Sequence, residues 1–135
     1  MRCPMCGRGT LRAIAHARTV AADDGTQLSF RDEIMGCSEC GETHYTHEQA
    51  LGSSRARAGA LRRHAGLLTP DEIRAFRESL GLSQSELEHL LGTGSKTVVR
   101  WEKGTVCQSR AADRLLRLLM ARRGNIGLLR GLARV

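Results

Sequence analysis

The hydrophobic and polar positions of the chain follow two different periods, and the change between them divides it. Between residues 11 and 35, apolar and polar residues tend to alternate, which indicates β-strands with one buried face. Asp23-Asp24-Gly25 interrupts this alternation and is a strong signal for a tight turn. The sequence therefore predicts a hairpin here. From residue 69 onward, apolar residues recur three or four positions apart, as they do in helices.

Start and stop signals divide the second region into a bundle of about five short helices. Residues 69–72 and 83–86 both have the composition of a capping box, and Ser95 is expected to cap a third helix over 96–103. The short glycine turn 92–94 joins the second of these helices to the third. Two short helices joined in this way have the layout of a helix-turn-helix, so an all-α DNA-binding bundle is predicted.

Charge supports the same division of the chain, which has 135 residues and a formal net charge of +7. Residues 1–46 carry five positive and six negative side chains, so the positive excess lies beyond them. We expect a neutral domain over 1–46, a basic helical connector over 47–68, and a domain over 69–135 suited to a polyanion. No apolar run is long enough for a membrane span and no signal peptide is recognisable, so a cytoplasmic protein is expected.

Four of the five cysteines form two C-x-x-C pairs, each followed directly by glycine. They are Cys3 with Cys6, and Cys37 with Cys40. Two residues between cysteines allow a tight turn that points both sulfurs at one ion, and the glycine permits the positive φ that such a turn needs. Four thiolates complete a tetrahedral site, so the pattern predicts one structural Zn²⁺ in a domain like a zinc ribbon.

Other interpretations of the cysteines fit less well. Two disulfides would suit a secreted protein, a thioredoxin-like motif needs only one C-x-x-C, and an iron–sulfur cluster stays possible. His44 and His47 follow the second pair and are possible substitute ligands, whereas Cys107 has no partner in the sequence. A zinc enzyme is disfavoured because no nucleophile and base stand at a recognisable spacing, so no catalytic residue is assigned.

The third predicted helix has a polar face with the residues of a DNA reader. Val98 and Trp101 are three positions apart and would point inward, so that Lys96 and Arg100 point outward as base-reading candidates. Contacts to the DNA backbone, or support of the base-reading residues, are expected from Gln84, Ser95, Thr97 and Lys103. The alternative is that these basic residues form an ordinary solvated helix face.

Two sequence blocks resemble the Xre/Cro family of phage-repressor-type DNA-binding domains. They are Leu80-Gly81-Leu82-Ser83-Gln84-Ser85-Glu86-Leu87 and Arg100-Trp101-Glu102-Lys103-Gly104. In that family an arginine seven residues before the glutamine pairs with the glutamate of the second block. The resemblance therefore implies a structural ion pair between Arg77 and Glu102.

With its two cysteine pairs, the whole chain resembles the MqsA-type zinc-finger antitoxins. This resemblance implies that the amino-terminal domain binds a cognate toxin, an mRNA-cleaving ribonuclease. It also implies that the carboxy-terminal domain forms a homodimer and represses its own operon at a palindromic DNA site. Lys96 stands where the family has an asparagine, so a different base preference is expected.

Two questions stay open at the level of sequence. The leucines of 115–119 and of the last short helix could form the dimer seam or simply belong to the core. The alternative to an antitoxin is a stand-alone transcriptional regulator whose zinc ribbon senses a ligand or recruits a protein partner.

Overall fold

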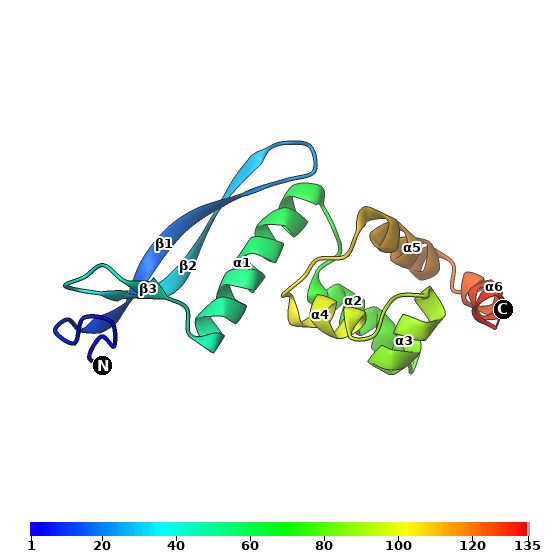
Figure 1. Ribbon diagram of the computed structural model, residues 1–135. Coiled ribbons are helices and arrows are strands. Elements are labelled where there is room, and N and C mark those ends of the chain that lie inside the picture. Colours follow the sequence, from blue (N-terminus) through cyan, green and yellow to red (C-terminus); the bar gives the residue numbers. More distant parts are fainter. Residues whose placement is uncertain (135) are drawn as a thin grey trace. The chain divides into compact units, whose positions relative to one another are not determined.

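The computed structural model describes residues 1–134, which form a small β-sheet followed by six helices (Figure 1). The elements are β1 (Leu11–Ala21), β2 (Gln27–Cys37), β3 (Thr43–His44), α1 (His47–Ala65), α2 (Pro70–Ser79), α3 (Gln84–Leu91), α4 (Thr97–Lys103), α5 (Arg110–Ala121) and α6 (Asn125–Ala133). The predicted fold class, a hairpin domain followed by a helical bundle, is confirmed. The chain divides into two compact units, one over Met1–His64 and one from Ala65 on. None of the described helices has the length and apolar character needed to cross a membrane.

The first unit is built on the antiparallel pair β1–β2, which runs in register from Leu11 opposite Cys37 to Ala21 opposite Gln27. The turn between them is fixed by Asp24, whose Oδ1 accepts a hydrogen bond from the Thr26 amide at 3.0 Å. Strand β3 adds two residues to the other side of β2. The register brings the second cysteine pair back to the start of β1, close to the first pair.

Helix α1 packs on the hairpin and so belongs to the first unit, although the sequence suggests a connector. Val20 and Phe30 form a small buried cluster with Ala60 of α1. The buried Asp32 carboxylate on β2 accepts hydrogen bonds from Ser53 Oγ of α1 at 2.6 Å and Tyr45 OH at 2.8 Å. This polar centre and a small apolar cluster hold the helix in place. The functional division into 1–46, 47–68 and 69–135 stays a prediction.

The second unit is a helical bundle around one core, which is aliphatic except for Phe76 and Trp101. Both predicted capping boxes are present, at Thr69 before α2 and at Ser83 before α3. The buried core is contributed by all five helices and the residue before them: Leu68, Ile73, Phe76, Leu87, Leu90, Val98, Trp101, Leu116, Leu119 and Ile126. Leu116 and Leu119 therefore belong to the core, whereas Leu118 is 61% exposed. The predicted leucine stripe thus divides between the core and the surface.

The predicted start of the third helix is wrong. Ser95 does not cap it, because the N-cap residue is Lys96 and the helix α4 begins at Thr97. Lys96 has a left-handed backbone with φ of 68°, and its side chain makes no capping hydrogen bond. A lysine rarely adopts this conformation, so the surrounding structure must impose it.

Candidate metal centre and nucleic-acid interface

The four cysteines of the two C-x-x-C pairs come together at one end of the first unit. Their Sγ atoms all lie within 4.8 Å of one another. The Cys3–Cys40 and Cys6–Cys37 Sγ distances are both 3.7 Å. Tetrahedral zinc with Zn–S bonds of about 2.3 Å requires sulfurs about 3.8 Å apart, so the cluster has the dimensions of a four-thiolate zinc site.

Backbone amides point at the sulfurs, as they do in metal-binding turns. Gly9 donates to Cys6 Sγ and Glu39 donates to Cys37 Sγ, both at 3.4 Å. The first turn is closed by the Cys3 amide, which donates to the Gly9 carbonyl at 2.8 Å. Such N–H groups stabilise thiolates, which are the metal-binding form of cysteine.

The ionisation of the thiols also favours a cation at this place. The backbone N–H groups of Cys40 and Glu39 lower the pKa of Cys37 to about 6. The amide of Glu42 favours the Cys40 thiolate, but the neighbouring sulfur of Cys37 and burial raise the pKa of Cys40 to about 12. Four adjacent thiolates repel one another, and a divalent cation would remove this penalty.

Gly9 is a part of this centre that the sequence interpretation missed. A Cβ atom at position 9 would collide with Cys37 Sγ and approach the Glu39 side chain to 3.0 Å. The first turn can therefore pass beside the second cysteine pair only if residue 9 has no side chain. Gly7 and Gly41, which directly follow the pairs, have φ of 70° and 72°, as glycine permits.

The remaining candidate ligands lie outside the cluster. Among residues 1–134, the potential metal-binding group consists of the four cysteines and includes neither His44 nor His47. Cys107 is half-buried in the second unit, between α4 and α5. The cysteine cluster is thus a closed set of four ligands of one kind.

In the second unit, α3 and α4 present the residues predicted to contact DNA. Val98 and Trp101 of α4 are buried, and on the same helix Arg100 is exposed. Lys96 is exposed at its start and Lys103 at its end, while Thr97 is half-buried and Ser95 is exposed. The structure therefore exposes Lys96 at the N-cap of α4 and Arg100 on the helix itself.

Arg77 and Glu102 join α2 to α4. Arg77 Nε and one of its terminal nitrogens donate to the two carboxylate oxygens of Glu102 at 2.7 and 2.9 Å. Gln84 Nε2 donates to the same carboxylate at 3.2 Å. The amide that was predicted to meet a DNA phosphate therefore contacts Glu102 in the protein alone.

Glu88 is a second feature that the sequence interpretation missed. It is 7% exposed, and its Oε2 accepts a hydrogen bond from the Val98 amide at 2.9 Å. This contact joins a side chain of α3 to the backbone at the start of α4.

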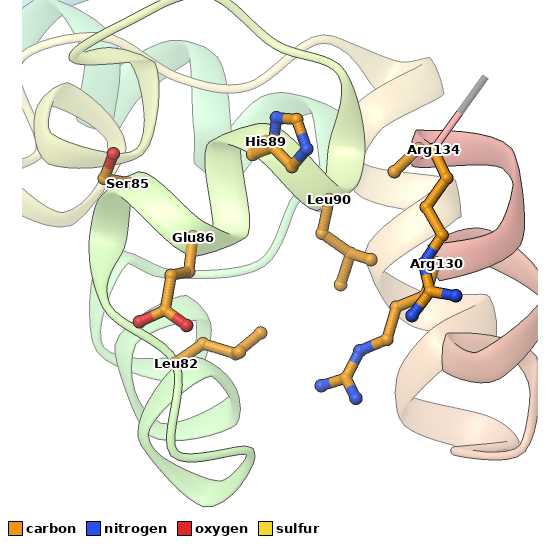
Figure 2. Close-up of a pocket in the computed structure, with 8 residues that line it drawn as sticks. Leu82, Ser85, Glu86, His89, Leu90, Arg130 and Arg134 are labelled. Carbon is orange, nitrogen blue, oxygen red and sulfur yellow. The ribbon is translucent and has the colours of Figure 1, made fainter.

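A groove of about 660 Å³ opens between α3 and α6 (Figure 2). Glu86 and His89 of α3 face Arg130 and Arg134 of the carboxy-terminal segment across it, with Leu90 at its side. None of the residues predicted to contact DNA lines this groove. It therefore lies outside the candidate DNA interface.

The model of a family described as "Antitoxin component of bacterial toxin-antitoxin system, MqsA" matches residues 1–127. A search of curated proteins found no match.

Proposed function

Since the chain belongs to the MqsA antitoxin family, we propose that it neutralises a ribonuclease toxin and represses transcription of its own operon. The observation that carries this proposal is the family match over 1–127, which spans both the cysteine cluster and the helices α3 and α4. The protein acts in the cytoplasm as a regulator of a type II toxin–antitoxin pair and is not an enzyme.

Cys3, Cys6, Cys37 and Cys40 hold one structural Zn²⁺. The sulfur spacing of 3.7 Å supports zinc, and four protein ligands leave no open position for a substrate. The metal would cross-link the two turns of a unit whose apolar clusters are small. Its role is therefore to stabilise the fold of this unit.

Metal analysis combined with circular dichroism tests the zinc site. Cys37→Ser should lose the metal and unfold the first unit while the second unit stays helical, and Cys107→Ser is the matched control that should keep one Zn²⁺ per chain. Unchanged zinc content in Cys37→Ser would contradict the four-cysteine assignment.

The second unit binds a palindromic DNA operator as a homodimer. Lys96 and Arg100 read bases, while Thr97, Ser95 and Lys103 contact or support the DNA backbone. Gln84 supports the DNA-binding surface through its hydrogen bond to Glu102, and its amide can contact a phosphate only if this hydrogen bond breaks. Exposed Leu118, Leu128 and Leu132 support dimerisation through α5 and α6, because apolar side chains of this size are costly to leave in water.

Two-fold symmetry gives the dimer its operator spacing. A symmetric pair of recognition helices that enters successive major grooves has centres about 34 Å apart, one turn of DNA. The operator should therefore consist of two half-sites about 10 base pairs apart.

The first unit binds the toxin, as the family match suggests. The near-neutral charge of residues 1–46 makes this part of the unit a poor partner for nucleic acid, since the excess of basic residues lies beyond residue 46. Co-purification with the product of the neighbouring gene, followed by an RNA-cleavage assay, tests this role. A neighbouring protein that neither binds the chain nor cleaves RNA would contradict it.

A further inference from the structure

The recognition helix α4 begins without a cap of its own. The first backbone N–H groups of a helix have no partner within it and are normally satisfied by the side chain of the N-cap residue. Here the N-cap residue is Lys96, whose side chain accepts no hydrogen bond and whose backbone is left-handed. The start of α4 therefore needs an acceptor from elsewhere in the fold.

Glu88 of α3 provides that acceptor. Its Oε2 receives the Val98 amide at 2.9 Å in a buried contact, ten residues away along the chain. Its backbone carbonyl also accepts from the amides of Gly92 and Thr93, both at 3.0 Å. Glu88 thus accepts hydrogen bonds at the end of α3 through its backbone carbonyl and at the start of α4 through its side chain.

We propose that Glu88 is a positioning residue that sets the orientation of α4 and so places Lys96 and Arg100 for base reading. This inference rests on the proposed DNA-binding function. Val98, the residue that Glu88 holds, lies between the two base-reading residues, and its side chain is fully buried. A shift of the backbone at Val98 therefore moves both of them together.

The chemistry of the contact suits this role. A carboxylate at the start of a helix is stabilised by the partial positive charge of the unsatisfied N–H groups. Glu88 is almost completely buried, and its Oε2 accepts a hydrogen bond from the Val98 amide, so this oxygen faces the start of α4.

The test compares the full-length, metal-loaded wild type with Glu88→Ala and Glu88→Gln. Glu88→Gln keeps an acceptor of the same size, whereas Glu88→Ala leaves the buried Val98 amide without a partner. The probes are the duplex that the wild-type protein selects from a random-sequence pool and an unrelated duplex of equal length. Glu78→Ala is the charge control, since it removes one carboxylate that is 62% exposed on α2.

For Glu88→Ala we expect the ratio of specific to non-specific affinity to fall by about tenfold or more, which is the effect of one lost base contact, because a displaced α4 no longer holds Lys96 and Arg100 against the base edges. The non-specific affinity of Glu88→Ala should stay within about threefold of the wild-type value. The affinity ratios of Glu78→Ala and Glu88→Gln should also stay within about threefold of the wild-type ratio. Amide exchange at Val98, measured without DNA, should accelerate in Glu88→Ala alone. If Glu88→Ala does not fold, Glu88→Asp replaces it, because it keeps the charge on a side chain one methylene shorter.

The outcomes separate the inference from the function on which it rests. If Glu88→Ala keeps the affinity ratio of the wild type although its Val98 amide exchanges faster, the positioning role alone is overturned. Amide exchange at Val98 as slow as in the wild type would overturn it too. A wild-type protein that selects no duplex would overturn the DNA-binding function and the positioning role together.

Discussion

Truncation of Arg77 tests how the buried carboxylate of Glu102 joins α2 to α4. The Glu102 side chain is 1% exposed, and Arg77 is 13% exposed and binds both of its oxygens. Burial opposes the charged form of Glu102, but the hydrogen bonds from Arg77 and Gln84 outweigh it, so the pKa of Glu102 lies below its usual value. Arg77→Ala therefore leaves a charged carboxylate in the core with only its weaker donors.

The structure allows the cost to be estimated. Removal of one partner from a buried ion pair costs about 3–5 kcal/mol. Gln84 and Arg74 remain at 3.2 and 3.4 Å, so we expect the lower end, about 3 kcal/mol, for Arg77→Ala. Arg74→Ala is the matched control, because Arg74 contacts the same carboxylate but is 46% exposed. Its loss should cost less than about 1 kcal/mol.

Urea unfolding followed by tryptophan fluorescence measures this difference in the unit concerned. Trp101 is the chain's single tryptophan, and it is buried in the core of the second unit. The free energy of unfolding should fall much further in Arg77→Ala than in Arg74→Ala. Equal losses in the two variants, or an Arg77→Ala protein as stable as wild type, would refute the reasoning.

Three further predictions follow from the other sites. Gly9→Ala should weaken metal binding in a chelator competition, because its Cβ collides with Cys37 Sγ, whereas Gly52→Ala on α1 meets no atom within 4 Å and should keep wild-type metal affinity. Arg100→Ala should cost about 1–3 kcal/mol of specific DNA affinity and relax one base position; equal losses on a random duplex would argue against base reading. Burial opposes the charged form of Asp32, but hydrogen bonds from Ser53, Tyr45 and His16 outweigh it and lower the pKa of Asp32. The stability that the charged Asp32 contributes is therefore present above about pH 4, and it is lost as the pH falls through the pKa of the folded state. Urea unfolding followed by Tyr45 fluorescence should therefore show an advantage of wild type over Asp32→Asn at pH 6 that shrinks toward pH 3, and an advantage independent of pH would contradict this.

Signals that act between neighbours in the chain are sufficient to predict most of the elements. The two capping boxes and the Asp23-Asp24-Gly25 turn each need only four or fewer adjacent residues, and all of them form. The cysteine spacing likewise predicts which residues could share a metal, since each pair is a local turn.

What the sequence could not predict depends on contacts between distant residues. Ser95 fails as a cap because Glu88, on the preceding helix, already occupies the Val98 amide. The need for glycine at position 9 arises only once the hairpin register brings Cys37 opposite Leu11. No local pattern shows either effect.

The two leucines of α5 that face the core show the same limit. Leu116 and Leu119 are buried while Leu118 between them is exposed, although all three fit one apolar stripe in the sequence. The stripe is wider than the face that α5 buries, so the packing of the other helices decides which leucines reach the surface. The exposed ones are those that the proposed dimer would cover.

RNA cleavage by the partner toxin tests the central claim most directly. The product of the neighbouring gene, which we propose to be the toxin, is incubated with a defined mRNA, alone and with an equimolar amount of the full-length protein. Cleavage should stop with the zinc-loaded wild type and continue with Cys37→Ser. Cleavage at an undiminished rate in the presence of the wild-type protein would contradict the central claim.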